Sequence, residues 1–177
     1  IEYYEQSLKM FCRIEDNRGK GVCLSNLGLA YIFLGNSHKA IEYYNRALKK
    51  SHNIGDKKNE RIHLGNLGNA YSDLGEPRKA IEYYEQALKI SREIGDRGGE
   101  GTGLGCLGDA YSDLSEPRKA IEYYEQALKI SREIGDRGGE GTGLGCLGDA
   151  YSDLSEPRKA IEYYEQALKI SREIGDR

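Results

Sequence analysis

The sequence repeats itself with a period of 40 residues, and this repetition limits the possible folds more than any single residue does. Residues 76–137 are identical to residues 116–177, and Gly68, Gly108 and Gly148 occupy the same place in successive copies. Tandem units of this length form stacked solenoids in which each unit contacts only its neighbours. We therefore predict a solenoid, an architecture whose long surface is better suited to binding than to catalysis.

Composition agrees with a thin core and a polar surface. Tryptophan is absent, there are two Phe and one Met, and 31% of the residues are charged. No apolar run approaches the roughly 20 residues of a membrane span, so we expect no membrane association. Ile1 already corresponds to Ile41 of the next copy, so we expect the chain to be a piece of a longer protein. An absent targeting segment then says little about the parent protein.

The charge is distributed unevenly along the chain. The net charge is −3, but residues 1–96 carry a small excess of basic side chains, whereas residues 97–136 and 137–176 are each acidic. Phosphate binding requires clustered Lys and Arg, so the C-terminal half is a poor candidate for nucleic-acid binding. The plainer interpretation of a mildly acidic surface is that it is solvated.

The cysteine and histidine residues predict neither a disulfide framework nor a metal site. The four cysteines form no CxxC pair, and Cys106 and Cys146 are separated by the repeat length itself. We expect reduced thiols in a cytoplasmic protein. His38, His52 and His63 have no partner at metal-ligand spacing, so we predict no zinc site and no other cofactor.

Each copy reads as two amphipathic helices. In residues 56–95, Asp56 is a candidate N-cap, Gly75 ends the first helix and Pro77 begins the second. The apolar face of the first helix is formed by Leu64, Leu67, Gly68, Tyr71 and Leu74. That of the second is formed by Ala80, Ile81, Tyr84, Ala87, Leu88 and Ile94. We expect a neighbouring helix to approach at Gly68. One unit cannot bury these faces alone and must stack.

The run LGNAYSDLGEPRKAIEYYEQAL (residues 67–88) resembles the tetratricopeptide repeat. It has Leu-Gly-x-x-Tyr in the first helix and Ala-x-x-x-Tyr-x-x-Ala in the second, and the resemblance extends over essentially the whole chain. The unit has 40 residues rather than the usual 34, and Leu64 stands where the family commonly has a large aromatic residue. The longer unit is similar to the repeats of spindle adaptors and kinesin light chains. HEAT-type repeats have a similar length but lack this Gly and Tyr pattern.

The resemblance implies an all-α fold, a right-handed α-solenoid of stacked antiparallel helical hairpins. We expect nine helices, or about four and a half repeats, in one domain over residues 1–177. The predicted boundaries are a half-repeat at 1–15 and repeats at 16–55, 56–95, 96–135 and 136–175. The first and last helices lack a neighbour, so we also expect end-to-end self-association.

A dinucleotide-type motif is present by coincidence. Residues 103–108 and 143–148 both match GxGxxG, but the segment before them is an amphipathic helix rather than the strand that a dinucleotide fold requires. No Walker lysine, no Ser-His-Asp set and no metal cluster accompanies the motif. We therefore predict that the chain is not an enzyme.

The resemblance places a partner-binding groove on the face of each first helix that is opposite the core. The predicted groove residues are Leu29, Ile32, Phe33, Asn66, Asn69, Ser72, Asp73, Thr102, Cys106, Asp109, Asp113, Thr142, Cys146, Asp149 and Asp153. This groove changes from apolar through amide-lined to acidic, and its carboxylates favour a basic or amphipathic peptide. Ser25, Gly65, Gly105 and Gly145 stand where some family members carry the lysine of a carboxylate clamp, which disfavours a receptor for C-terminal tails.

Glycines crowd the helices predicted near residues 98–114 and 138–154. Each interior glycine costs about 1 kcal/mol relative to alanine. One hypothesis is that a ligand orders these loosely held helices, and the alternative is recent duplication under weak selection. For the repeated Tyr83-Tyr84 pair we favour packing, with one ring in the core and the other between repeats, over phosphorylation or a stacking platform.

We predict a protein–protein interaction scaffold that binds an extended peptide or a helix of a partner protein in this groove. The two alternatives are a self-assembling structural array and a regulatory or sensor segment of a larger multidomain protein.

Overall fold

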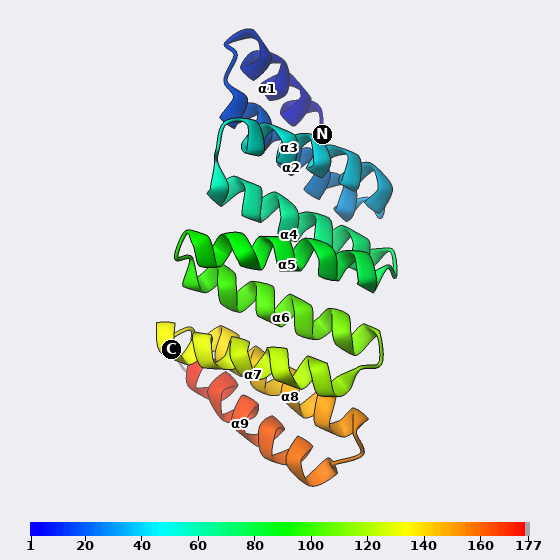
Figure 1. The fold of residues 1–177 in the computed structure, drawn as a ribbon, viewed down its shortest axis with the longest axis vertical. Helices are drawn as coiled ribbons and strands as arrows, with labels where there is room; N and C mark the ends of the chain where they lie inside the picture. The colour runs from blue at the N-terminus through cyan, green and yellow to red at the C-terminus, as the bar shows by residue number, and fades with distance from the viewer. Residues whose placement is uncertain (176–177) are drawn as a thin grey trace. The chain divides into compact units, whose positions relative to one another are not determined.

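The computed structural model describes residues 1–175, which form nine helices and no strand (Figure 1). The chain divides into two compact units, which we call unit 1 (Ile1–Ile94) and unit 2 (from Gly95). Unit 1 contains α1 (Glu2–Arg13), α2 (Asn17–Phe33), α3 (Ser37–Asn53), α4 (Lys57–Asp73) and α5 (Pro77–Glu93). Unit 2 contains α6 (Arg97–Asp113), α7 (Pro117–Ile134), α8 (Arg137–Asp153) and α9 (Pro157–Gly175).

Helices that follow one another in the chain pack together within each unit. In unit 1, α2 packs on α3, α3 on α4 and α4 on α5, with α1 against α2. In unit 2, α6 packs on α7, α7 on α8 and α8 on α9. The predicted all-α class and the stacked helical hairpins are therefore confirmed. That residues 1–177 form one continuous solenoid stays a prediction, based on the sequence repeat.

Local sequence signals set the ends of the helices. The Asp56 carboxylate accepts a hydrogen bond from the Asn59 backbone N–H at 3.2 Å, which satisfies one of the free donors at the start of α4. Gly75 adopts a left-handed φ of 69° after α4, and Pro77 is the first residue of α5. These are the start, stop and restart signals that the sequence predicts.

Three turns among the described residues depart from this glycine rule, one of them at Glu15 after α1, with a φ of 57°. Ser115 and Ser155 have φ values of 56° and 59° at the turns after α6 and α8, where Gly35 and Gly75 stand in unit 1. A side chain in the left-handed region costs roughly 1–2 kcal/mol, whereas glycine adopts it freely. The two serine turns of unit 2 therefore carry strain that the glycine turns of unit 1 avoid.

The recurring Gly of each first helix receives the second Tyr of the paired helix. A Cβ atom at Gly68 would lie 2.3 Å from Cε1 of Tyr84, and one at Gly108 would lie 2.4 Å from Cε1 of Tyr124. Contacts this short are not tolerated, so the glycine is required by the ring that lies on it. At Gly68 this ring, rather than a bare neighbouring helix, makes the close approach.

The two tyrosines of a pair have different environments, as the packing interpretation predicts. Tyr84 is buried, whereas the Tyr83 ring stacks on Tyr71 with its centroid 5.3 Å away. Tyr83 also packs against a buried cluster that includes residues of α3 and α4. The expectation for Ile94 is wrong, because this residue follows the end of α5 and is 40% exposed, and Ile90 is the buried isoleucine instead.

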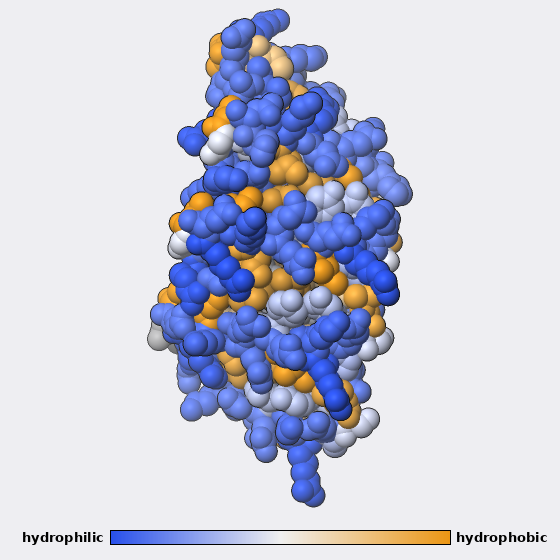
Figure 2. Space-filling view, viewed as in Figure 1, coloured by the Kyte–Doolittle hydropathy of each residue, from blue (hydrophilic) through white to orange (hydrophobic). Residues whose placement is uncertain are grey.

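Polar side chains cover most of the visible surface, and apolar residues show between them (Figure 2). Among residues 1–175, no helix combines the length and the apolar character that a membrane span requires.

Candidate binding groove

We call the side of α2, α4, α6 and α8 that carries the predicted groove residues the groove face. On α2, Leu29 and Phe33 are exposed, and Phe33 keeps 81% of its surface accessible. Ile32 behaves differently, since it is half-buried and packs against the cluster that contains Ala40 and Leu67. The apolar end of the predicted groove therefore consists of two exposed side chains, while the third belongs partly to the core.

The amides on the groove face of α4 hold unit 1 together. The Asn66 amide donates a 3.2 Å hydrogen bond to the Ser25 hydroxyl of α2, and the Tyr84 hydroxyl donates a 2.8 Å bond to Oδ1 of Asn69. Asn66 and Asn69 therefore already use part of the hydrogen-bonding capacity with which they could bind a peptide backbone. Asp73 is exposed and Ser72 is half-buried farther along the same helix.

In unit 2 the groove face carries carboxylates that are also bonded to tyrosine. The Tyr124 hydroxyl donates to Asp109 at 2.8 Å, and the Tyr164 hydroxyl donates to Asp149 at 2.7 Å. Asp109 is the counterpart of Asn69 one repeat later. Desolvation raises the pKa of Asp109, the Tyr124 hydrogen bond opposes this effect, and the nearby Asp113 charge adds to it.

The two thiols of unit 2 are held in their neutral form. Burial raises the pKa of Cys106 to about 11, and the Asp109 charge adds to this shift. Burial likewise raises the pKa of Cys146 to about 11, with contributions from the Asp109 and Asp149 charges. Thiols with such pKa values are poor nucleophiles, and all four cysteines of the chain are free.

A pocket of about 250 Å³ opens on the groove face between α6, α7 and α8. Five of the predicted groove residues line it: Thr102, Cys106, Asp109, Thr142 and Cys146. Its wall also includes five glycines at which the helix backbone is bare: Gly98, Gly101, Gly105, Gly139 and Gly143. Asp113, Asp149 and Asp153 are exposed but lie outside this wall. The structure thus brings together the small-residue part of the predicted groove.

Helix α7 contributes residues to this pocket that the sequence does not predict as part of the groove. Ala127, Ile130 and Ile134 of α7 form an apolar part of the wall, and Tyr124 of the same helix also lines the pocket. The repeat pattern predicts Ala127 and Ile134 as part of the apolar face of the second helix and predicts no role for Ile130. Their spacing on one face of a helix was visible in the sequence, but the gap between two successive first helices was not.

The corresponding positions in unit 1 carry larger side chains. Two repeat periods of 40 residues each separate Gly143, Thr142 and Cys146 from their counterparts His63, Ile62 and Asn66. The counterpart of Gly105 on the preceding first helix is Ser25, which bonds to Asn66 across the groove face. The same backbone positions are therefore filled in unit 1 and open in unit 2.

His63 is the most buried of these larger side chains. It is 1% exposed, and neither ring nitrogen has a hydrogen-bond partner within residues 1–175. Burial lowers the pKa of His63 to about 4, although the Asp56 charge opposes the shift. The ring is therefore neutral at pH 7 and acts as an apolar filler rather than as a ligand.

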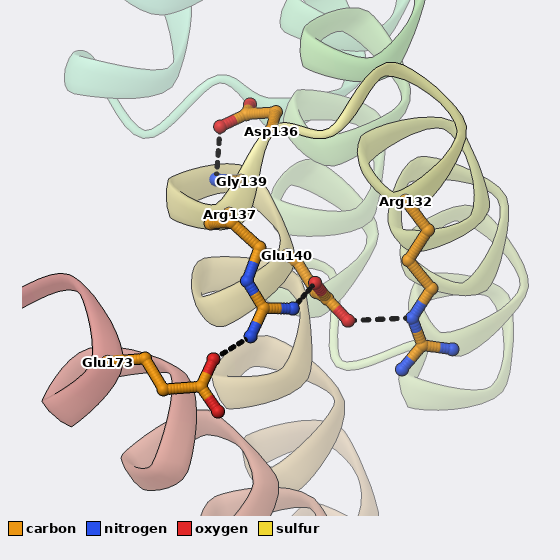
Figure 3. A network of polar contacts seen from close by, with 6 residues as sticks. All are labelled: Arg132, Asp136, Arg137, Gly139, Glu140 and Glu173. Carbon is orange, nitrogen blue, oxygen red and sulfur yellow. Dashed lines mark hydrogen bonds and ion pairs between the residues drawn. The ribbon is translucent and has the colours of Figure 1, made fainter.

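On the opposite side, ion pairs connect the helices of unit 2 (Figure 3). Arg132 of α7 donates a hydrogen bond to Glu140 of α8 at 2.9 Å. Arg137 of α8 donates hydrogen bonds to Glu140 of the same helix and to Glu173 of α9. Glu140 is only 8% exposed, and the Arg132 hydrogen bond lowers its pKa. Unit 1 has a related set in which Glu60 forms an ion pair with Lys57 at 3.1 Å and lies 2.9 Å from Nδ1 of His52. These charged groups join helices to one another.

A larger hollow of about 720 Å³ lies beside this network between α7, α8 and α9. Its wall mixes both signs of charge, with Glu125 and Glu162 beside Lys129 and Lys159. Such a wall selects no single ligand chemistry. The groove face, where acidic side chains predominate, is the more specific candidate site.

Within residues 1–175, no group of three or more His, Cys, Asp or Glu side chains could hold a metal ion. The two GxGxxG runs lie inside α6 and α8, and their last glycines, Gly108 and Gly148, receive tyrosine rings. The glycine arrangement of a dinucleotide site, at a turn between a strand and a helix, does not occur there.

Comparisons with known proteins identify the repeat. The sequence pattern of the tetratricopeptide repeat matches residues 1–51, 24–93 and 99–173. BtubC (BKLC) from P. vanneervenii is 22% identical with a TM-score of 0.89, and the match covers 97% of this chain and 72% of that one. A putative kinesin light chain with nearly identical repeats from Podosopora anserina is 18% identical with a TM-score of 0.80, over 99% and 87% of the two chains.

A third structure adds a functional context. A signal-transduction ATPase with numerous domains from Pyrococcus horikoshii, which has a tetratricopeptide-repeat sensor, is 28% identical with a TM-score of 0.82. The match covers 94% of this chain and 26% of that protein. No curated protein sequence matches the chain significantly.

Proposed function

This chain belongs to the tetratricopeptide-repeat family, and from that premise we propose that it is a binding module for an extended, basic segment of a partner protein. The segment lies along the groove face of α6 and α8. The observation that carries the proposal is the open pocket of unit 2, where Gly105, Thr142 and Gly143 stand at positions that carry the larger Ser25, Ile62 and His63 in unit 1.

The charge of the groove face determines the preferred ligand. Asp109, Asp113, Asp149 and Asp153 are exposed on the two first helices of unit 2. Complementary charges on a partner speed up encounter and exclude acidic competitors. The ligand is therefore a segment rich in Lys or Arg, in which apolar side chains can follow the glycine-lined part of the face.

A peptide array tests this proposal. Residues 1–177 are compared with an Asp109→Lys, Asp149→Lys double variant on arrays of basic, acidic and amphipathic peptides. Basic peptides bind the parent chain at least tenfold more tightly than the double variant, because two favourable charges have become repulsive. The motif shared by the bound peptides then describes the partner segment.

The matched control is a Glu122→Lys, Glu162→Lys double variant. It makes the same change in net charge at exposed positions of α7 and α9. If this control keeps peptide binding and the helical circular dichroism of both variants is unchanged, the binding lost in Asp109→Lys, Asp149→Lys is assigned to the groove face. Equal loss in both variants would show a general charge effect and contradict the proposal.

The relative from Pyrococcus horikoshii favours a second candidate function. Its tetratricopeptide repeats are a sensor joined to an ATPase. In this alternative the present chain is the regulatory segment of a multidomain protein, and the groove ligand controls an effector domain. Fusing the chain to its native neighbouring domains and measuring their activity with and without a groove peptide distinguishes a sensor from a passive scaffold.

Exposed apolar side chains on α9 favour a third candidate, end-to-end association of copies of this chain. Ile161 and Leu168 are 55% and 51% exposed, whereas their counterparts Ile121 and Leu128 on α7 are almost buried. Sedimentation of the parent chain and of Leu168→Lys tests this. Association that the substitution removes supports it, and a monomer at high concentration excludes it.

A further inference from the structure

The pocket of unit 2 is not a necessary consequence of the fold. A Cβ atom built at Gly105 meets no atom within 4 Å, and one built at Gly143 lies 3.7 Å from Cβ of Leu128, an ordinary contact. Larger residues therefore fit the backbone at both positions, and unit 1 carries Ser25 and His63 there. At Gly108 the situation is the reverse, since Tyr124 requires the glycine.

The floor of the pocket is suited to an unbranched aliphatic chain. Ala127 and Ile130 are buried and face the glycine backbone of the first helices. The hydroxyl of Thr102 donates to the Gly98 carbonyl at 3.0 Å, so its hydrogen is already used within α6. A pocket of about 250 Å³ is smaller than the roughly 300–1,000 Å³ of small-molecule sites and fits a single side chain.

The rim of the pocket is suited to one positive charge. Asp109 lines the pocket and remains exposed, and one of its oxygens accepts the Tyr124 hydrogen bond. In the part of the chain that the structure describes, no Lys or Arg side chain forms an ion pair with this carboxylate, and the nearby Asp113 carries a like charge. The carboxylate thus has an uncompensated charge beside an apolar cavity.

We propose that this pocket takes one lysine side chain of the partner segment, with its four methylene groups against Ala127 and Ile130 and its ammonium group on Asp109. The inference rests on the proposed function and names the residue that anchors the segment. Lysine is preferred over arginine because Tyr124 already occupies one Asp109 oxygen. A guanidinium group gains most from two free carboxylate oxygens, whereas an ammonium group is a point charge that needs only one.

The pocket can be tested without any peptide, using n-butylammonium as the lysine side chain and n-butanol, butyrate and n-propylguanidinium as comparisons. Binding at constant ionic strength is followed by the shifts of the glycine amide resonances. Butylammonium binds at least tenfold more tightly than butanol or butyrate, and more tightly than propylguanidinium. Equal binding of butylammonium and butanol, or a preference for propylguanidinium, would overturn the assignment.

Three variants locate the binding. Asp109→Asn makes butylammonium no better than butanol and still folds, because Asn69 makes the same bond with Tyr84 in unit 1. Gly143→His places the unit 1 filler in the pocket and abolishes binding of both probes. Asp149→Asn, the matched change outside the pocket wall, alters butylammonium affinity less than twofold. Equal weakening by Asp109→Asn and Asp149→Asn would contradict the proposal.

The array peptides separate this inference from the proposed function. If a lysine-containing peptide binds the parent chain and Gly143→His equally well, the groove remains a binding surface. The pocket is then not the anchor of the peptide. If the parent chain binds no basic peptide, the proposed function is contradicted, whether or not butylammonium binds the pocket.

Discussion

Helices α4 and α8 are built alike yet present different surfaces, and the difference separates what the repeat determines from what it leaves open. Both have 17 residues, begin after an aspartate cap and receive a tyrosine ring on a glycine. On the groove face, α4 carries His63 and Asn66, whereas α8 carries Gly143 and Cys146. The repeat therefore determines the backbone, while the side chains at a few of these positions differ in size between unit 1 and unit 2.

The largest expected difference concerns local stability. Helix α6 contains four more glycines than α4, two of them in its first turn, so at about 1 kcal/mol for each interior glycine its opening is about 2–4 kcal/mol easier. Amide hydrogen exchange without ligand is therefore up to about a thousandfold faster in α6 and α8 than in α4. Peptides from α6 and α8 are identical in sequence and report their average. Equally slow exchange in α4 and α6 would rule out loosely held glycine helices.

The pH response of unit 1 is the next largest effect. Because burial lowers the folded-state pKa of His63 to about 4, the unfolded chain, with a pKa near 6.5, binds this proton more tightly. The His63 contribution to stability is full above pH of about 6.5 and is lost as pH falls towards 4, by about 3 kcal/mol. Urea titrations of the parent chain and His63→Leu measure this difference. The control His38→Leu, at an exposed position, keeps His63 and therefore keeps the pH dependence of the parent chain.

Substituting a packing glycine destabilises unit 2. In Gly108→Ala the new methyl group would lie 2.4 Å from the Tyr124 ring, and overpacking of this kind costs roughly 1–3 kcal/mol. Thermal unfolding of Gly108→Ala and of Gly68→Ala in unit 1 measures this loss. Similar losses are expected because the Gly–Tyr contact is the same in both units. An unchanged melting temperature would mean that the ring does not rest on the glycine.

Substituting a pocket glycine has the opposite effect. A methyl group at Gly105 meets no atom within 4 Å, so Gly105→Ala stabilises α6 by about 1 kcal/mol through helix propensity alone. Gly65→Ala is the matched change in unit 1, where the added methyl group also lies in open space. A destabilised Gly105→Ala protein would show that this glycine serves packing rather than an open groove face.

The smallest effect concerns the carboxylate at the pocket. Desolvation raises the folded-state pKa of Asp109, so its ionised form opposes folding as pH rises through that pKa. Asp109→Asn therefore raises the melting temperature slightly at neutral pH, and the gain vanishes in acid. Asn69→Asp is the reverse exchange beside Tyr84 and lowers the melting temperature at neutral pH. A gain from Asp109→Asn that persists in acid would contradict this explanation.

The sequence predicts the frame of the molecule well because that frame depends on local signals. Asp56, Gly75 and Pro77 act within one turn of the chain, and the stripe that includes Leu64 and Leu67 follows from helical periodicity. The prediction that Ile94 is buried is wrong because periodicity does not show where the helix ends. Beyond the end of α5, the apolar stripe no longer faces the core.

The pocket is less predictable because it depends on three helices together. The sequence placed Thr102, Cys106 and Asp109 on the groove face but gave no means of combining them with Ile130 of the next helix. It also could not show that Asn66 bonds to Ser25, since the two residues meet only when successive hairpins stack. A difference in side-chain size between equivalent repeat positions, such as Gly143 and His63, is the sequence signal that could have indicated an open site.

The most direct measurement transfers the groove face of α4 onto α8. A Thr142→Ile, Gly143→His, Cys146→Asn variant carries the three unit 1 residues in unit 2 and leaves every charged side chain in place. Its affinity for the basic peptides selected on the array is compared with that of the parent chain. The account predicts that the variant folds and loses peptide binding at least tenfold. Undiminished binding would show that the open pocket of unit 2 is not part of the binding surface.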